Sequence, residues 1–374
     1  MSNVSTEPLL LQHLFSKAVA NAVPISGTFE LTARCNLSCK MCYVHLQQSE
    51  LTASELSADE WVRLAEEACE QGMLLALLTG GEPLLRPDFT EIYARLKQLG
   101  IVISINTNGT LIDGDMLEYF LHNPPYRINM SVYGASPATY ERLCGNANAY
   151  YRATDALKRL IEHGIDVKVN LSVTQHNLDD ALDIYRMVHD LGAHVQAATY
   201  MFPPVRRSGA VPDRMTPEQS ARTALDVDRL RFGDAAFAER LRRTLDGITP
   251  PDPDRECFDL PSEPLFCRAG RCTFWLTWDG RMLPCGMMET PVARPLEQGF
   301  SEAWKHVHAQ TRAILLPAEC TACPKRHACE VCAASCYTET GAFDGVPRYM
   351  CARTDATLAM AGDILRLLEG QNAD

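Results

Sequence analysis

The sequence predicts an α/β fold around a parallel sheet, either barrel-like or doubly wound, followed by a cysteine-rich region. Two observations support this prediction. Between about residues 27 and 203, short apolar runs alternate with longer amphipathic stretches, which is the pattern of βαβ units. Ten of the fifteen cysteines then lie between residues 257 and 351, so the second region differs in chemistry from the first.

Six apolar runs have the length of β-strands. In a parallel sheet of either kind, chemistry lies where the strands end, so the residues directly after each run are the first site candidates. The expected strands are TFELTA (28–33), LLALLT (74–79), IVISIN (101–106), RINMSVY (127–133), VKVNLSVT (167–174) and HVQAATYM (194–201).

The stretches between these runs place apolar residues at i, i+3 and i+4, which predicts helices with one buried face. Most of them end at a glycine, which is a helix-stop signal. The expected helices are 57–72, 86–100, 113–123, 150–164 and 177–192.

Composition divides the remainder of the chain. Pro/Gly-rich pieces flank a charged helical stretch, 222–243, for which we expect a solvated face. No internal repeat of fixed period is present. The expected units are an N-terminal extension (1–26), the strand–helix core (27–203), a linker or helical lid (204–256), a cysteine-rich domain (257–353) and a C-terminal helix (354–374).

The net charge, the apolar runs and the cysteine placement argue against several classes of protein. The formal net charge of −12 argues against non-specific binding of nucleic acid, which needs a basic surface. No signal-peptide pattern and no membrane-length apolar stretch are present, so we expect a cytoplasmic protein without a membrane partner. In a reducing compartment, clustered cysteines indicate metal or cluster ligands rather than disulfides. Cys69 and Cys144 are isolated in the sequence.

Three cysteines directly follow the first expected strand, as Cys35-x3-Cys39-x2-Cys42. Three thiols satisfy neither a disulfide pairing nor a four-cysteine metal site. A structural zinc ion is one alternative, since it takes four ligands and His45 offers a fourth.

This motif resembles the signature of the radical S-adenosylmethionine (SAM) superfamily. The resemblance implies that the three thiolates hold three irons of a [4Fe–4S] cluster, and that the amino and carboxylate groups of SAM bind the fourth iron. It also implies that an electron from the cluster splits SAM into methionine and a 5′-deoxyadenosyl radical, which abstracts hydrogen from the substrate. The implied fold is a partial (β/α)6 barrel of the TIM type.

The ends of the next strands strengthen the resemblance. Gly80-Gly81-Glu82-Pro83 resembles a loop that contacts the SAM amino group, and the segment after the third strand resembles the family's TNG segment. Ser131 fits a contact to the SAM ribose and Asn170 a contact to ribose or substrate, and ordinary strand packing is the alternative for both. Arg142 resembles the family's arginine that approaches the SAM carboxylate, and Arg152 is the alternative for that role. The implied cofactor-binding residues are Tyr43, Gly80, Gly81, Glu82, Pro83, Asn106, Thr107, Asn108, Ser131, Arg142 and Asn170.

The second cysteine region resembles the SPASM domain, an appendage of radical SAM enzymes that carries auxiliary [4Fe–4S] clusters. Zinc knuckles are the alternative, because Cys-x2-Cys pairs suit zinc. The matching positions are Cys267, Gly280, Cys285, Cys320, Cys323, Cys329 and Cys351.

One departure concerns Ala333, which stands where the family has a cysteine, with Cys332 and Cys336 on either side. Cys257 is expected to be spare. The resemblance implies that the outer cluster is held by Cys320, Cys323, Cys329 and Cys351, and the inner one by Cys267, Cys285 and Cys332 or Cys336, with Cys272 as a plausible fourth ligand.

Aromatic residues surround an Asp279-Gly280 dipeptide in this region. Such a dipeptide is typical of a hairpin turn. We therefore expect a hairpin here, with Phe274, Trp275 and Trp278 in its core.

Enzymes with a SPASM domain mostly modify peptides, so the sequence predicts a radical SAM oxidoreductase that matures a ribosomal peptide, for example by a thioether or carbon crosslink. A small-molecule dehydrogenase or cofactor-biosynthesis enzyme is the alternative. A sulfatase-type maturase is less favoured, because Gly286 stands where those enzymes have an aspartate. A non-catalytic iron–sulfur electron carrier is least favoured, since it needs no GGEP loop. Glu289, Tyr133 and Asp279 are weak candidates for catalytic residues.

Two further partners follow from the resemblance. Reduction of the cluster needs an external electron donor of flavodoxin or ferredoxin type. Only 34 residues precede Cys35, which is too few for the winged-helix leader-binding domain of many peptide maturases. A separate leader-binding protein is therefore expected if a leader is recognised.

Overall fold

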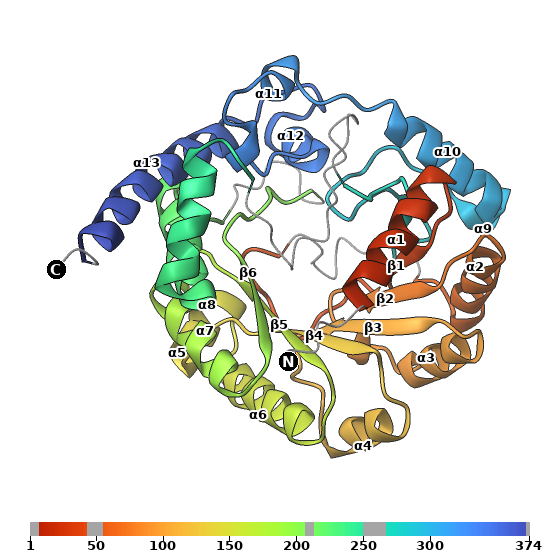
Figure 1. Ribbon diagram of the computed structural model, residues 1–374. Helices are drawn as coiled ribbons and strands as arrows, with labels where there is room; N and C mark the ends of the chain where they lie inside the picture. The colour runs from red at the N-terminus through yellow and green to blue at the C-terminus, as the bar shows by residue number, and fades with distance from the viewer. Residues whose placement is uncertain (1–6, 43–54, 206–212, 250–266, 372–374) are drawn as a thin grey trace.

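The computed structural model describes residues 7–42, 55–205, 213–249 and 267–371. Within these residues the strands are β1 (Ser26–Glu30), β2 (Leu75–Thr79), β3 (Val102–Thr107), β4 (Arg127–Ser131), β5 (Val167–Ser172), β6 (His194–Ala198), β7 (Thr273–Leu276) and β8 (Met282–Leu283). They form one curved sheet in the order β6-β5-β4-β3-β2-β1-β7-β8 (Figure 1). Every pair is parallel except β7–β8.

The six predicted strands are confirmed as β1–β6. One strand pairing was not foreseen: β7, from the cysteine-rich region, pairs with the outer edge of β1, where Thr28 stands opposite Trp275. The hairpin predicted around Asp279-Gly280 is confirmed, since β7 and β8 flank it and Gly280 has the positive φ of +82° that favours glycine.

Helices α2–α7 cover the outer side of the sheet (Figure 1). The five predicted helices are confirmed as α2, α3, α4, α6 and α7, and the short helix α5 is an addition. The helices are α1 (Glu7–Ala20), α2 (Ala58–Glu70), α3 (Phe89–Gln98), α4 (Gly114–His122), α5 (Pro137–Cys144), α6 (Asn148–Glu162), α7 (Ala181–Asp190), α8 (Pro217–Leu245), α9 (Pro295–Gln298), α10 (Phe300–Arg312), α11 (Ala318–Thr321), α12 (Ala333–Thr340) and α13 (Arg348–Gln371).

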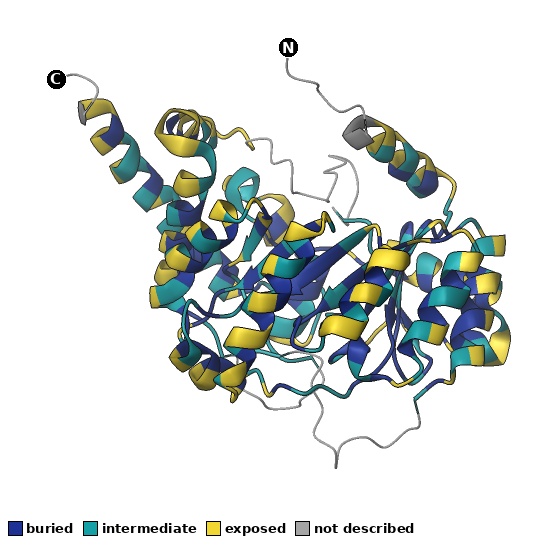
Figure 2. Ribbon diagram, turned by 90° about the horizontal axis from the view of Figure 1, so that it is seen from below, coloured by how far each residue is buried: buried dark blue, intermediate teal, exposed yellow. Residues whose placement is uncertain are grey.

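The main core lies between the outer face of the sheet and this layer of helices. Phe29 of β1 is fully buried and stacks on Trp61 of α2, with 5.5 Å between ring centroids. Side chains alternate across a strand, so the neighbouring polar positions, such as Thr28 and Asn106, face the other side. Figure 2 shows the result: buried strands lie at the centre, and exposed residues lie on the outer surfaces of the helices.

Helix α8 carries the charged stretch for which we expected a solvated face. Its outer side is charged, but its other side packs against α13, with Leu225, Phe237 and Leu241 beside Ala361 and Leu368. The two helices lie side by side in Figure 1. None of the helices in the described part of the chain has the length and apolarity needed to cross a membrane.

Two polar networks attach the cysteine-rich region to the end of β6. The Tyr200 hydroxyl donates to Glu339 of α12 at 2.7 Å, and Arg214 forms an ion pair with the same carboxylate. The Arg214 guanidinium also stacks on the Tyr349 ring, 3.8 Å from its centroid. In the second network, Arg353 of α13 donates to Thr199 at 3.2 Å. The cysteine-rich region is therefore fixed at the carboxyl end of the sheet.

Candidate functional site

Three half-buried cysteines lie on the loop after β1. The Cys42 N–H donates to the Cys39 carbonyl at 3.1 Å. Burial raises the pKa of the Cys35 thiol to about 12; the Glu82 carboxylate and the other two thiols act in the same direction, and a hydrogen bond from the Leu37 N–H opposes them. The three thiols therefore share one site, where a thiolate needs nearby positive charge to form.

The cysteine loop rests on the C-terminal end of α5. The Ser38 N–H donates to the Cys144 carbonyl at 3.0 Å, and the Lys40 N–H donates to the Leu143 carbonyl at 3.0 Å. The Cys144 thiol is buried and forms a hydrogen bond with the Cys39 thiol. Cys144, isolated in the sequence, is thus a fourth thiol beside the motif.

The GGEP loop lies directly against the backbone of the cysteine loop. The Gly81 N–H donates to the Thr32 carbonyl at 2.7 Å, and the Glu82 N–H donates to the Arg34 carbonyl at 2.9 Å. A Cβ atom on Gly81 would overlap the Arg34 carbonyl oxygen, so only glycine allows this approach. A Cβ atom on Gly80 would likewise overlap the Thr32 carbonyl oxygen. Pro83 begins a 3-10 turn that covers residues 83–85.

The Glu82 carboxylate is completely buried between the ends of β2 and β3. It accepts hydrogen bonds from the Leu84 N–H at 3.1 Å, the Thr107 hydroxyl at 2.8 Å and the Asn108 N–H at 2.7 Å. Burial raises its pKa to about 7, although the three donors act against the rise. A carboxylate held in this way has acceptor capacity left for a cation.

Asn108 connects the end of β3 to the cysteine loop. Its side-chain amide donates to the Asn36 side chain at 2.9 Å and lies 3.9 Å from the Cys35 sulfur. Asn106 faces a different neighbour, because its side-chain oxygen accepts from the Asn129 amide at 2.9 Å. The polar segment after the third strand is therefore divided between the cysteine loop and β4.

Ser131 and Asn170 are paired across β4 and β5, so these two predicted residues share one position along the sheet. The Tyr133 hydroxyl forms hydrogen bonds with Ser131 and with the Cys39 thiol. Burial raises the pKa of Tyr133 well above its usual value, and the Cys39 and Cys144 thiols contribute. Tyr133 therefore links the end of β4 to the cysteine motif.

Arg142 is turned toward a neighbouring loop. It is exposed, and its guanidinium donates to the His176 carbonyl at 3.0 and 3.1 Å and to the Thr139 hydroxyl at 3.2 Å. Its competitor Arg152 is also exposed, on α6. A role for either in binding the SAM carboxylate stays a prediction, and for Arg142 it would require these bonds to be exchanged.

The other candidates are scattered. Asp279 lies in the β7–β8 turn and forms an ion pair with Arg281 at 2.9 Å. Glu289 is exposed beyond β8. Tyr43, together with the alternative ligand His45, lies outside the described residues. A catalytic role for Asp279 or Glu289 stays a prediction.

The cysteines predicted to hold the outer cluster lie close together. Burial raises the pKa of the Cys320 thiol, and Cys351, Cys329 and Cys323 raise it further in that order. Cys336 is buried on α12, and its pKa is raised to about 12 by burial and by the neighbouring thiols of Cys320, Cys332 and Cys329.

Two more cysteines of this region have different surroundings. Cys285 packs in the same apolar cluster as Cys320, Cys332 and Cys336. Cys272 is fully buried in another cluster, between α1 and the sheet, and burial raises its pKa to about 11. Cys272 therefore packs in a different cluster from Cys285, Cys332 and Cys336, and its role as a fourth ligand stays a prediction.

The donor set of the cysteine loop fits an iron–sulfur cluster. Three thiols converge where burial disfavours free thiolates, and iron supplies the charge that stabilises them. The Leu37 N–H lies 3.5 Å from the Cys35 sulfur, which is a contact that thiolate ligands of such clusters accept. In the residues that the structure describes, no three His, Cys, Asp or Glu side chains are spaced for a single metal ion. The ligands of an iron–sulfur cluster bind different iron atoms at its corners. Their sulfur atoms therefore stand farther apart than the ligands of a single metal ion.

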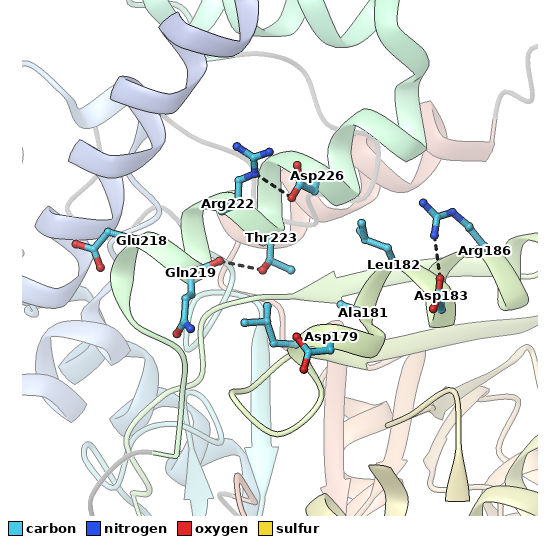
Figure 3. A pocket seen from close by; sticks show the side chains of 11 residues that line it. Asp179, Ala181, Leu182, Asp183, Arg186, Glu218, Gln219, Arg222, Thr223 and Asp226 are labelled. Atoms are coloured by element: carbon cyan, nitrogen blue, oxygen red, sulfur yellow. Dashed lines mark hydrogen bonds and ion pairs between the residues drawn. The ribbon is translucent and has the colours of Figure 1, made fainter. Parts of the chain in front are cut away.

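A surface groove lies between the segments of α7 and α8 (Figure 3). Its guanidinium groups are already paired: Arg222 with Asp226 at 3.1 Å, and Arg186 with Asp183 at 2.9 Å. None of the cofactor-binding, catalytic or metal-binding residues predicted from the sequence lines this groove. The candidate site is therefore the cysteine loop and the strand ends around it.

Comparisons with known proteins identify the family. The model of the radical SAM superfamily matches residues 29–203, which include the three cysteines, the end of β1 and strands β2–β6. The PqqA peptide cyclase of Gluconobacter oxydans is 30% identical over 291 residues, covering 75% of this chain and 76% of the cyclase. The AdoMet-dependent heme synthase of Methanosarcina barkeri is 26% identical over 345 residues, covering 87% of this chain and 95% of the synthase.

A solved structure has the same fold. Streptococcus suis SuiB bound to its precursor peptide SuiA superposes with a TM-score of 0.67 at 16% identity, covering 92% of this chain and 81% of SuiB. The peptide cyclase and SuiB are SPASM-type peptide maturases, whereas the heme synthase acts on a different class of substrate. The sequence motif, the geometry of the strand ends and these likenesses lead to one conclusion: the chain belongs to the radical SAM superfamily and is an enzyme of its SPASM type.

Proposed function

We propose that this enzyme abstracts hydrogen from a peptide substrate and thereby matures it, for example by forming a thioether or carbon crosslink. The observation that carries the proposal is the junction of the GGEP loop with the three-cysteine loop, at the Glu82 N–H to Arg34 carbonyl bond of 2.9 Å. It is supported by the likeness to a peptide cyclase and to SuiB, whose solved complex contains a precursor peptide.

Each part of the site has a proposed task. The [4Fe–4S] cluster, held by Cys35, Cys39 and Cys42, supplies when bound the electron that cleaves SAM. Glu82 accepts the ammonium group of SAM, because its buried carboxylate has no other cation in contact among the described residues. The Ser131 hydroxyl and the Asn170 amide hold the ribose or the substrate at the barrel mouth.

The cysteine-rich region is proposed to hold auxiliary [4Fe–4S] clusters, as the domain over residues 257–353. Cys320, Cys323, Cys329 and Cys351 are the proposed ligands of the outer cluster, which their mutual proximity supports. Cys267 and Cys285, with Cys332 or Cys336, remain the proposal for the inner one. An external low-potential donor and a separate leader-binding protein complete the proposed system, in a reducing cytoplasmic compartment.

The first test is cleavage of SAM. The protein is reconstituted with iron and sulfide without oxygen, reduced with dithionite and incubated with SAM, and 5′-deoxyadenosine is measured. Product is expected from the wild type and not from Cys39→Ala, which should retain the iron of the C-terminal clusters. No product from a fully loaded wild type would refute SAM cleavage, and product from Cys39→Ala would refute the role of this cysteine.

The second test identifies the substrate. Peptides encoded next to this gene are added, and mass spectrometry looks for a loss of two hydrogens. A second candidate, a heme-type small-molecule reaction, is favoured by the 95% coverage of the heme synthase relative. A tetrapyrrole precursor of heme, added in place of the peptides, discriminates between them: turnover of the tetrapyrrole without change in any peptide would overturn the peptide proposal.

A further inference from the structure

A fourth thiol lies beside the cysteine motif, and the proposed function gives it no task. Cys144 is the last residue of α5, and it is 1% exposed. It is separated from the motif by the segment 43–143 but touches it in space. The strand ends used for SAM do not include it, and α5 was not foreseen from the sequence.

The contact between Cys144 and the motif is fixed at both the backbone and the side chain. The carbonyl groups of Leu143 and Cys144 accept the N–H groups of Lys40 and Ser38, each at 3.0 Å. These bonds hold the end of α5 on both sides of Cys39, and the thiols of Cys39 and Cys144 are hydrogen-bonded to each other. The backbone bonds therefore hold the Cys39 and Cys144 residues next to each other.

Ligation of iron decides the direction of this hydrogen bond. A cysteine that ligates iron is a thiolate and has no proton to donate, so the proton must come from Cys144. Cys144 is shielded from water at the end of α5, and α5 is capped by Gly145 in the left-handed conformation, with φ of +70°. The S–H group therefore has the Cys39 sulfur as a well-placed acceptor.

Hydrogen bonds to the sulfurs of an iron–sulfur cluster are among the factors that set its reduction potential. Each donor withdraws charge from the thiolate and stabilises the reduced, more negative cluster. We propose that Cys144 is a positioning residue that donates an S–H···S hydrogen bond to the cluster-bound sulfur of Cys39 and makes the SAM-binding cluster easier to reduce by one electron from the external donor.

This inference rests on the proposed assignment of Cys35, Cys39 and Cys42 as cluster ligands. It goes beyond that assignment because Cys144 is not a ligand in it. The Tyr133 hydroxyl is a second donor to the same sulfur. It remains in every Cys144 variant, so each variant changes one donor only.

The test is anaerobic potentiometry of the reconstituted full-length enzyme, followed by electron paramagnetic resonance. The signal that changes when SAM is added identifies the cluster with the open iron and separates it from the auxiliary clusters. Cys144→Ala and Cys144→Val, which has a similar volume and no donor, should shift the midpoint potential of this signal to more negative values. Cys144→Ser, which keeps an O–H donor, should restore it wholly or in part.

Cys69→Ala is the matched control, because Cys69 is the other cysteine isolated in the sequence. The charged neighbour of its thiol is Glu66 and not a cysteine of the motif. It should leave the potential unchanged. An unchanged potential in Cys144→Val with the cluster fully loaded would overturn the inference, and so would equal shifts in the Val and Ser variants. A wild type without any SAM-responsive signal would instead overturn the cluster assignment, so the two failures are distinguishable.

Discussion

The buried Glu82 carboxylate makes the stability of the protein depend on pH. Burial raises its pKa from 4.5 to about 7, so the folded state keeps a proton that the unfolded chain releases. The contribution of Glu82 to the unfolding free energy is therefore fully present below pH 4.5 and is lost as the pH rises toward about 7. Each unit of pKa difference is worth about 1.4 kcal/mol, so the total loss is roughly 3 kcal/mol.

Glu82→Gln removes this dependence, because the glutamine amide stays neutral at every pH. The assay is urea unfolding of the iron-free, reduced protein at a series of pH values. Between about pH 5 and pH 8, the unfolding free energy of the wild type should fall by roughly 2–3 kcal/mol relative to Glu82→Gln. Thr107→Val, which removes one donor to the carboxylate and keeps the shape, should extend the fall to higher pH.

A difference between the wild type and Glu82→Gln that stays constant across this pH range would refute the reasoning. It would mean that Glu82 is ionised in the folded protein throughout. A difference that changes with the opposite sign would mean that a buried cation faces the carboxylate.

Three further predictions concern the loop contact, the network at β6 and the outer cluster. Gly81→Ala should abolish formation of 5′-deoxyadenosine because its Cβ overlaps the neighbouring loop, whereas Gly114→Ala, which has open space around it, should not. Arg214→Ala should lower the unfolding free energy by about 3 kcal/mol, since it leaves Glu339 at 11% exposure without its ion pair; an unchanged urea midpoint would contradict this. Cys351→Ala should remove one cluster's worth of iron and sulfide and keep the SAM-responsive cluster signal; full iron content would contradict the ligand assignment.

The six barrel strands were predictable because each is a short apolar run followed by a polar strand end. The place of β7 was not. Its pattern predicts a hairpin, and the hairpin is there, but the pairing of Thr28 with Trp275 depends on a contact between residues far apart in the chain. Local patterns specify an element and its faces, whereas the free edge that it joins is decided by long-range packing.

The same distinction applies to α8 within the linker region. Its charged residues are visible in the sequence and predict a solvated face. Leu225, Phe237 and Leu241 are spread among them, and their partners Ala361 and Leu368 lie on the final helix. The apolar side of α8 is therefore recognisable only when both helices are considered together.

In the site, convergence at the strand ends was predictable from the parallel sheet itself. Parallel strands end at one edge, so Glu82 after β2 and Asn108 after β3 must lie near the cysteines after β1. They do: the Asn108 N–H donates to Glu82 at 2.7 Å, and the Asn108 side-chain amide lies 3.9 Å from the Cys35 sulfur. The orientation of Arg142 was not predictable, because its exposed side chain is directed by the His176 carbonyl on another loop.

Cys144 shows where this reasoning stops. A strand end is positioned by the sheet, so its neighbours follow from strand order, but a helix end is positioned by the length of the helix. If α5 were one residue shorter or longer, its last residue would rotate by about 100° and a different side chain would face Cys39. The end at Gly145, whose φ of +70° stops the helix, is thus what places a thiol there. Gly145→Ala should strain this end and disturb both carbonyl contacts with Ser38 and Lys40. It should therefore weaken retention of the SAM-responsive cluster, whereas Gly164→Ala at the end of α6, with a similar φ of +76°, should not.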